Sequence, residues 1–291
     1  MNNRILKELE IYLSKSDNQK SSHWKNLLED VDYYNIYKTF GLAGNTKIKL
    51  HKIPIHNLFQ RLIFGNKIFK TKEYHLFKKL CHIQNRQLDA DVMRHAFTFN
   101  LLNRYNLLKN NICIIGDGKA NCVGGLLTMN KKDIKIYSIN LTEVLIHDYL
   151  MIRNINLIDD DSIIVVNNEK DLENPNKKLF LIDASNVHFL KNKNININLF
   201  INIASMQEMK PDSVEHYFQV IKSNSAYFYC CNREYKKLIG GEELIFNQYP
   251  WGDCKIIVWE RCPWYKKNYN SKYPFIHKKQ SILKHALVKY S

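Results

Sequence analysis

The amino-acid sequence predicts an α/β fold in which a mostly parallel β-sheet, covered by helices, follows a mainly helical N-terminal region. Apolar residues of the first part recur at helical spacing, as in residues 73–87 and 89–108. From Asn111 onward, short β-branched runs alternate with amphipathic segments of helix length, which is typical of strands joined by helical crossovers. The last two predicted strands are joined by a turn too short for a helix, so this pair is expected to be antiparallel.

The length and composition favour one main domain with extensions at both ends. With 291 residues, of which 45% are hydrophobic, the chain can bury one sizeable core but is too short for three independent domains. We assign residues 1–108 to a mainly helical region, expected to act as a lid or to bind substrate. Residues 109–262 are assigned to an α/β domain that carries the ligand site, and residues 263–291 to a basic tail.

The formal net charge of +15 raises the hypothesis of a nucleic-acid partner. The chain is also rich in Lys, Asn, Ile and Tyr together, which an AT-rich genome would produce, so part of the basicity follows from codon usage. The positive charge is concentrated at the end of the chain, where residues 261–291 include no carboxylate. This tail is expected either to contact an anionic partner, such as a nucleotide-sugar, a lipid head group or RNA, or to be simply solvated.

The N-terminus and the cysteines indicate a cytoplasmic protein. The first twenty residues are charged and helix-like, without the apolar core and cleavage site of a signal peptide. No apolar run is long enough to span a bilayer. The seven cysteines are scattered and include no C-x-x-C pair, which is typical of reduced core thiols rather than of disulfides or zinc ligands.

The order of the predicted strands narrows the fold class. The strands are expected at residues 112–115, 134–139, 162–166, 178–182, 199–204, 226–231, 244–247 and 255–260. The last two form a hairpin around Pro250 and Gly252, whereas a dinucleotide-binding domain would continue to alternate strand and helix. A terminal antiparallel hairpin on a mostly parallel, Rossmann-like sheet is typical of S-adenosylmethionine (SAM)-dependent methyltransferases, and this fold is what the sequence predicts.

The first predicted strand runs into the turn 116–120 (GDGKA), at the place where such sheets bind their ligand. Gly116 and Gly118 would let the backbone approach the methionine and ribose parts of SAM. The dinucleotide pattern G-x-G-x-x-G is poorly matched, because Asn121 takes the third glycine position, and no P-loop sequence follows. A purely structural turn is the alternative interpretation. The cofactor contacts expected in this turn are Gly116, Asp117, Gly118 and Ala120.

Further cofactor contacts are expected at the ends of the next strands. Asn140 and Leu141 follow the second predicted strand, and the amide of Asn140 can both donate to and accept from the ribose hydroxyls. The alternative role of Asn140 is the N-cap of the following helix. Asp183 ends the strand 178–182 and is expected either to accept from the adenine amino group or to cap a turn.

Residues 199–234 carry the motif Asn-x-x-Ser-Met-Gln-Glu-Met (202–209) and a further asparagine at the end of the next strand. This region resembles the sugar O-methyltransferases, and the segments IGDGKA, SINLTEVLIHDYL and SSHWKNL are also similar to that family, so that the resemblance covers roughly residues 20–262. It implies SAM as methyl donor, S-adenosylhomocysteine (SAH) as product, and as acceptor a hydroxyl of a surface polysaccharide, glycolipid or nucleotide-sugar. It also implies cofactor contacts from Ser205 and Met206, and acceptor contacts from Gln207 and Asn232.

Two residues depart from the general methyltransferase pattern. Ile114 stands where many members of the superfamily carry an acidic residue, and Ala120 replaces the third small glycine. The overall layout of strands therefore supports cofactor binding more strongly than the turn itself does.

Methyl transfer to an alcohol is an in-line displacement that needs alignment of the reactants and a group to take the hydroxyl proton. Glu208 directly follows the strand 199–204 and is the first candidate for this general base. His216, on the succeeding helix, is the second. The alternative for Glu208 is a carboxylate that stabilises the start of a helix, and for His216 it is an ordinary helix position.

Upstream residues are expected to contact the acceptor if the helical region closes over the site. These candidates are His23, Trp24, Arg94 and His95. Trp24 would stack on a sugar face, although a tryptophan at such a position also commonly anchors a helix. The acidic run Asp159–Asp161 is interpreted as a loop, so no metal is predicted.

Three functions are compatible with these features. The first is a SAM-dependent sugar O-methyltransferase acting on a sugar or glycan, anionic acceptors included. The second is an RNA methyltransferase, suggested by the basic tail but not by any Asn/Asp-Pro-Pro-aromatic motif or recognised RNA-binding segment, so nucleic acid is not the expected partner. The third is a non-catalytic Rossmann-like binding protein, suggested by Ile114 and Ala120.

Overall fold

The structure is a computed structural model that describes most of the chain. The described residues are 4–14, 16–29, 32–35, 53–129, 131, 133–192, 194–269 and 276–291. Residues 36–52, which the sequence analysis included in the N-terminal helical region, lie outside this part.

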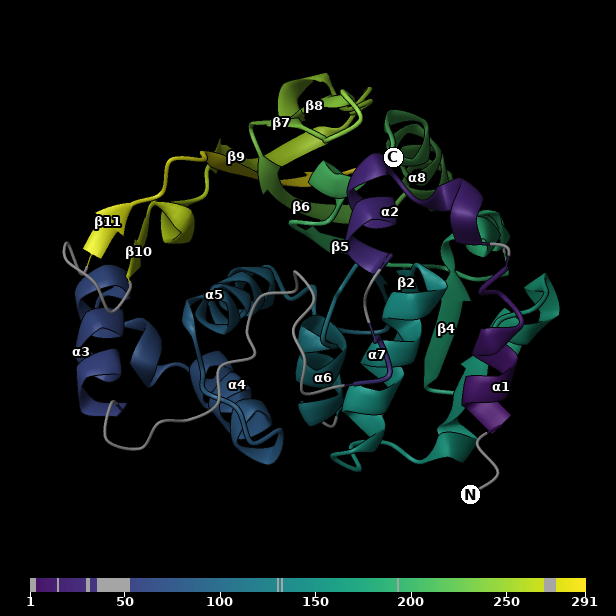
Figure 1. The fold of residues 1–291 in the computed structure, drawn as a ribbon, viewed down its shortest axis with the longest axis horizontal. Coiled ribbons are helices and arrows are strands. Elements are labelled where there is room, and N and C mark those ends of the chain that lie inside the picture. The colour runs from purple at the N-terminus through teal and green to yellow at the C-terminus, as the bar shows by residue number, and fades with distance from the viewer. Residues whose placement is uncertain are drawn as a thin grey trace.

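An eight-stranded sheet forms the centre of the molecule (Figure 1), with the strand order β3-β4-β2-β1-β5-β6-β12-β9. Neighbouring strands from β3 to β6 are parallel, whereas β12 is antiparallel to both β6 and β9. This layout confirms the predicted Rossmann-like methyltransferase fold. The bounds are β1 Asn111–Ile115, β2 Lys135–Asn140, β3 Ile163–Val165, β4 Leu179–Asp183, β5 Leu199–Ile203, β6 Tyr227–Arg233, β9 Lys255–Arg261 and β12 Leu283–Lys289.

The central strands are apolar throughout because both faces of the sheet are covered. Successive side chains of a strand point to opposite faces, so Ile112 and Ile114 of β1 join one core layer, and Cys113 and Ile115 join the other. The first layer holds residues of α1 (Arg4–Glu10), α4 (Lys72–Ile83), α5 (Ala90–Arg104), α6 (Asn121–Thr128) and α7 (Thr142–Arg153). The second holds residues of the 3₁₀-helix η6 (Ala184–Lys191) and of α8 (Pro211–Ser223).

In the N-terminal region, α4 and α5 pack against α6 beside the sheet (Figure 1), whereas α1 packs against α7 and β3. A Cβ atom on Gly125 would lie 2.8 Å from the ring of Phe77, and one on Gly124 would lie 3.1 Å from Leu80. The glycine pair of α6 therefore allows close packing of α4, rather than approach of a ligand. The remaining helices of this region are α2 (Ser22–Leu28), at the carboxyl edge of the sheet, and α3 (Ile53–Phe64).

The predicted hairpin between strands 244–247 and 255–260 is wrong. The first of them is β8 (Glu243–Ile245), which pairs with β7 (Tyr235–Lys237) in a separate two-stranded sheet. The second is β9, and its partner in the sheet is β12. A short connection shows that two strands cannot be parallel neighbours, but it does not show that they pair with each other. The antiparallel end of the sheet consists of β12 and β9 instead.

The prediction of a basic tail after residue 262 is also wrong for residues 283–289, which form β12 between β6 and β9. Ala286, Leu287 and Val288 are completely buried there. The segment was mistaken for a tail because lysines and a histidine flank these three apolar residues, so that its overall composition is polar and basic. A short hairpin of β10 (Lys267–Tyr269) and β11 (Ile276–Lys278) precedes this strand and contacts α3 through β10. Within the described part of the chain, no helix has the length and apolar character needed to cross a membrane.

Candidate active site

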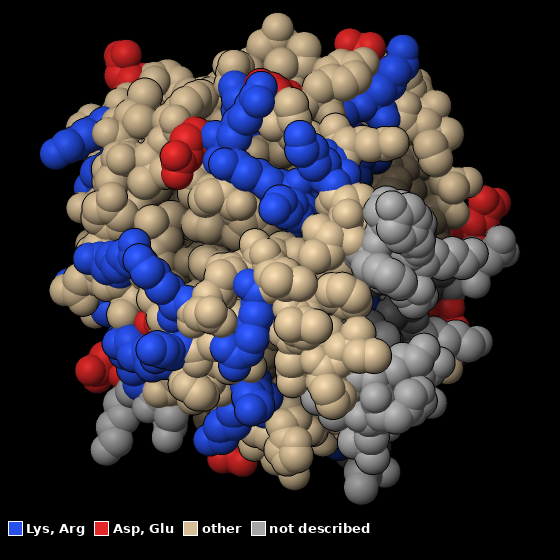
Figure 2. All heavy atoms as spheres, turned by 90° about the vertical axis from the view of Figure 1, so that its left-hand side faces the viewer, with Lys and Arg blue, Asp and Glu red and all other residues tan. Residues whose placement is uncertain are grey.

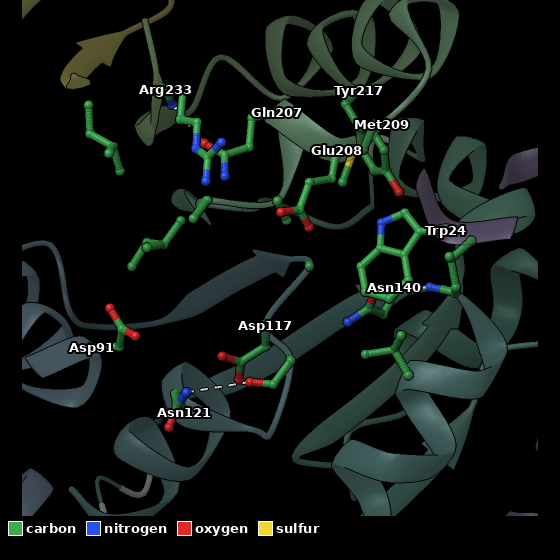
Figure 3. A pocket seen from close by; sticks show the side chains of 18 of the residues that line it. Trp24, Asp91, Asp117, Asn121, Asn140, Gln207, Glu208, Met209, Tyr217 and Arg233 are labelled. Atoms are coloured by element: carbon green, nitrogen blue, oxygen red, sulfur yellow. Dashed lines mark hydrogen bonds between the residues drawn. The ribbon is translucent and has the colours of Figure 1, made fainter. Parts of the chain in front are cut away.

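A cavity of about 250 Å³ lies at the carboxyl edge of the sheet (Figure 3). The carboxyl ends of parallel strands meet at one edge, so residues far apart in the sequence converge there. β1 and β5 are neighbours at the point where the strand order reverses, which is where open α/β sheets bind ligands. The cavity is lined at the ends of β1, β2, β4, β5 and β6 by Gly116, Asn140, Ala184, Ser205 and Arg233.

The turn after β1 depends on glycine at its first position. Gly116 has a φ of +69°, and a Cβ atom there would lie only 2.5 Å from the Cβ of Ser205 and closer still to its hydroxyl. Gly118, with a φ of +60°, is followed by Lys119 and Ala120, which also have positive φ angles. Of the residues predicted to contact the cofactor in this turn, Gly116 and Gly118 line the cavity, whereas Ala120 is completely buried behind it.

Asp117 lines the cavity, but its carboxylate also holds the turn against α6. Its two oxygens accept hydrogen bonds from the backbone N–H groups of Cys122, at 2.7 Å, and Val123, at 2.8 Å. Asp148 of α7 accepts in the same way from the N–H of Ala120, at 2.7 Å. Burial raises the pKa of Asp117 to about 6, although both hydrogen bonds favour its charged form, and burial also raises the pKa of Asp148.

Asn140 closes the end of β2 and lines the cavity. Its Oδ1 accepts from the N–H of Leu141 at 3.1 Å, and its Nδ2 donates to Asp148 at 3.4 Å. These bonds orient the amide, and they leave one N–H and one lone pair for a further partner. Leu141, which also lines the cavity, occupies the N-cap position of α7 that was the alternative role of Asn140.

Trp24 of α2 forms an apolar corner of the cavity next to Asn140 (Figure 3). It packs against Leu141 and Val144, and Ala184 lies beside them. This corner, which includes the predicted acceptor contact Trp24, therefore lies at the ends of β2 and β4.

Asp183 does not line the cavity. Its Oδ1 accepts from the N–H of Ser185 at 2.9 Å and caps η6, and its Oδ2 accepts from the hydroxyl of Thr142 at 2.5 Å. The capping role that the sequence left open is the one that the structure supports.

The motif at 202–209 forms a buried hydrogen-bonded network between strand ends. Asn202 donates from Nδ2 to the carbonyl of Ile115, at 2.9 Å, and the hydroxyl of Ser205 donates to the same carbonyl at 2.9 Å. Asn232 donates to Oδ1 of Asn202 at 2.7 Å and accepts from the N–H of Gln207 at 3.1 Å. Of the predicted ligand contacts, Ser205 and Gln207 line the cavity, whereas Met206 and Asn232 are completely buried behind its wall.

Glu208, the first candidate for the general base, points into the cavity (Figure 3). Burial raises the pKa of its carboxyl above the ordinary value, and the positive charges of Lys236 and Arg233 act in the opposite direction. Nε2 of His23 lies 3.7 Å from Oε2 of Glu208. Burial lowers the pKa of His23, so this imidazole is neutral at pH 7.

Segment 19–28 is attached to both sides of the cavity. Lys20 forms an ion pair of 2.6 Å with Glu143 of α7. The hydroxyl of Ser21 donates to the carbonyl of Glu208 at 2.5 Å, and that of Ser22 donates to Glu242 at 2.7 Å. The N-terminal region thus contributes a wall of the cavity, and its role as a lid stays a prediction.

Of the three remaining predicted site residues, His216, Arg94 and His95, only His95 lines the cavity. His216 faces η6, where His188 and Lys191 are the charges that act on it, and it does not line the cavity. Arg94 is buried behind the cavity wall, where it donates to the carbonyls of Trp264, at 3.0 Å, and Lys267, at 3.1 Å. His95 lines the cavity, and burial lowers its pKa to about 4.

The structure adds residues that the sequence analysis did not assign to the site. Those used below are Asp91, Tyr217, Arg233, Tyr265, Lys279 and Ser281. Arg233 ends β6, so it could have been predicted as Asn140 was, from its position at the carboxyl end of a parallel strand. The last three lie in the segment 263–291, for which contact with an anionic partner was one expectation, but no motif in the sequence singled these residues out. Among the described residues, no group of three or more His, Cys, Asp or Glu side chains is arranged to hold a metal ion.

Comparisons with known proteins give fold likenesses only. No family model and no curated protein matches the sequence. A Thermoplasma acidophilum protein, 1320, aligns over 76% of this chain and 98% of its own with 9% identity and a TM-score of 0.41. The mitomycin 7-O-methyltransferase MmcR aligns over 98% of this chain and 68% of its own, with 8% identity and a TM-score of 0.40. The N-terminal domain of EvdMO1 with SAH bound aligns over 68% of this chain and 84% of its own, with 7% identity and a TM-score of 0.38. At these values, the likenesses assign no activity to this chain.

Proposed function

We propose that this protein is a SAM-dependent O-methyltransferase that methylates a hydroxyl group of a sugar or glycan. The observation that carries the proposal is the convergence of three features on one cavity at the switch point of a methyltransferase-type sheet. These are the turn at Gly116, the oriented amide of Asn140 and the inward-pointing carboxylate of Glu208. If the turn at Gly116 were purely structural, there would be no need for the amide of Asn140 and the carboxylate of Glu208 to face the same cavity.

The residues on the β1, β2 and β4 side of the cavity fit the cofactor. Asn140 has a donor and an acceptor left for the ribose hydroxyls. The corner of Trp24, Leu141, Val144 and Ala184 offers apolar and aromatic surface to a planar adenine. When bound, SAM supplies an electrophilic methyl group on a sulfonium. We therefore place Trp24 with the cofactor rather than with the acceptor.

Glu208 is the proposed general base. Its carboxylate lies on the wall opposite Asn140 and Asp117, where it can take the proton of an acceptor hydroxyl (Figure 3). Its pKa, raised by burial, makes it a stronger base than an exposed carboxylate. Neutral His23, at 3.7 Å, would hold the charged carboxylate in place without competing for its proton at pH 7.

The acceptor would occupy the part of the cavity beyond Glu208. This part offers hydrogen-bonding side chains and an aromatic face, which are the groups that proteins use to hold sugars. They are Gln207, Arg233, Tyr265 and Ser281. The similarity of residues 202–209 to the sugar O-methyltransferases supports the same acceptor class, from surface polysaccharides and glycolipids to nucleotide-sugars.

The test is calorimetric titration with SAH, followed by transfer of labelled methyl groups from SAM to panels of sugars, nucleotide-sugars and RNA. Glu208→Gln should lower kcat about 100-fold or more, the usual scale for loss of a general base, with SAH affinity within twofold of the wild type. His216→Gln, outside the cavity, is the control and should retain normal turnover. A protein that binds no SAH would refute the proposal in favour of a non-catalytic role, and methylation of RNA but of no sugar would refute the acceptor class.

A further inference from the structure

Two cations line the end of the cavity opposite Trp24. Arg233 projects from the end of β6, and Figure 3 shows it on the side away from Trp24 and Asn140. Lys279 lies in the segment that leads from β11 into β12. The two are brought together by strand pairing, because Arg233 is the register partner of Leu283 at the start of β12. The hydroxyl-bearing Ser281, which lies between Lys279 and Leu283 in the sequence, also lines the cavity.

Among the described residues, neither side chain has a carboxylate at ion-pair distance, although the charge of Arg233 acts on Glu208 and that of Asp91 acts on Lys279. Among the described residues, the guanidinium of Arg233 forms no hydrogen bond or ion pair, and its backbone N–H alone donates to Gln207. Within the same part of the chain, the ammonium of Lys279 has no carboxylate at ion-pair distance, and its nearest described partner is the ring of Tyr265, with the centroid at 5.1 Å. Burial and the charges of Arg94 and Arg233 lower the pKa of Lys279, and the carboxylate of Asp91 acts in the opposite direction.

The nearby carboxylates have other partners. Asp91 is ion-paired with the buried Arg94. Glu208 lies beside the neutral His23 and feels the charge of Arg233 without forming an ion pair with it, and Asp117 is bonded to the first turn of α6. Two unpaired cations with a hydroxyl donor form a set that recognises an oxyanion, since guanidinium, ammonium and O–H groups all donate to it.

The surface around this end of the cavity is also basic. Figure 2 shows Lys and Arg side chains gathered on the face that lies at the left of Figure 1, where β9, β10 and β11 are found. Exposed cations of these strands and the turn before β10 include Arg261, at the same edge of the sheet as Arg233, and Lys266, Lys267 and Lys278. Such a field attracts anions toward the opening, but it does not select among them.

We propose that Arg233 and Lys279 form a subsite for an oxyanion of the acceptor, the carboxylate of an acidic sugar or the phosphate of a nucleotide-sugar. This inference rests on the proposed function for the identity of the acceptor. It places the anionic group at the far end of the cavity, so that a hydroxyl of the same molecule reaches Glu208.

The experiment is calorimetric titration of the full-length protein, with and without saturating SAH, with three probes: methyl β-glucuronide, UDP-glucose and the neutral methyl β-glucoside. Arg233→Met and Lys279→Met remove the charge but keep an unbranched side chain of similar length. Each should raise the Kd of the charged probe about tenfold or more, the loss expected for a charge-assisted hydrogen bond, and weaken its salt dependence. Which of the two charged probes responds distinguishes the carboxylate from the phosphate. The Kd values of the neutral probe and of SAH should change less than twofold.

Lys278→Met is the matched control, since Lys278 is exposed, precedes Lys279 directly and does not line the cavity. If Lys278→Met raised the Kd of the charged probe as much as the other two substitutions, the affinity would come from general surface charge, and the subsite would be refuted. A loss of SAH affinity in the Arg233 or Lys279 variant would assign the cations to the carboxylate of the cofactor instead. Absence of binding by both charged probes to the wild type would also overturn the proposal. If the charged probe binds but SAH does not, the subsite stands and the proposed function fails.

Discussion

Gly116→Ala should destabilise the protein and weaken SAH binding, because two separate penalties act at this position. The φ of +69° costs an alanine about 1–2 kcal/mol relative to glycine. The added Cβ atom would also lie 2.5 Å from the Cβ of Ser205, and overpacking of this kind costs about 1–3 kcal/mol. The free energy of unfolding should therefore fall by about 2–5 kcal/mol, measured by urea denaturation. This is less than the total stability of a typical domain, so a folded variant remains for titration.

Gly65→Ala separates the two penalties. Gly65 has nearly the same backbone angle, with a φ of +73°, but a Cβ atom there would have nothing within 4 Å. Its alanine variant should lose only about 1–2 kcal/mol and bind SAH normally. Equal destabilisation by the two substitutions would refute the argument from close packing.

Ser205→Gly tests the partner of the clash. Combined with Gly116→Ala, it removes the atoms that the new Cβ atom meets, and the double variant should be more stable than the sum of the single effects predicts. SAH affinity, which should fall tenfold or more in Gly116→Ala because the displaced Ser205 lines the same cavity, should partly return. Additive effects on stability would show that the two residues do not meet.

Four further outcomes are expected. Trp24→Ala should raise the Kd of SAH about tenfold in calorimetry, as loss of stacking on a base would, and leave acceptor binding unchanged. Because burial raises the folded-state pKa of Asp117 to about 6, the stability that its protonated form contributes should be lost as pH rises from about 4 to 6, and Asp117→Asn should flatten this part of a denaturation series. kcat/KM should decline as pH falls through the pKa of Glu208, with the midpoint above its ordinary value of 4.5. Deletion of residues 270–291 removes β12 and should abolish folding, as judged by circular dichroism.

The parts of the fold that the sequence predicted correctly are those fixed by local pattern. A strand buried on both faces is a continuous apolar run, so β1 and β5 could be located directly. β12 could not, because its segment LKHALVK has only three consecutive apolar residues, which lie between polar residues in a lysine-rich context. Its place is fixed by pairing with β6 and β9, which are distant in the sequence.

Some residues of the candidate site could likewise be predicted from local sequence pattern, whereas others reach the cavity only through contacts between distant segments. Gly116 and Asn140 directly end strands, and the topology of parallel sheets predicts that such residues converge. Lys279 reaches the cavity only because β12 pairs with β6. Trp24 reaches it because hydrogen bonds such as that from Ser21 to Glu208 hold the start of α2 there, and no local sequence pattern predicts such contacts. His216 does not reach the cavity for a geometric reason. Its neighbour Tyr217 lies on the face of α8 that lines the cavity, and His216 points to another face.

The placement of the motif 202–209 changes what its resemblance to sugar O-methyltransferases supports. Asn202 and Asn232 are completely buried, and their amides connect the ends of β1, β5 and β6. Residues with this role are required by any acceptor that reacts at this edge of the sheet, because they set the distance between the cofactor turn and Glu208. They do not meet the acceptor themselves. Selectivity for the charge of the acceptor should depend on residues outside the motif, and Arg233 and Lys279 are the positions at which exchange of one side chain should change it.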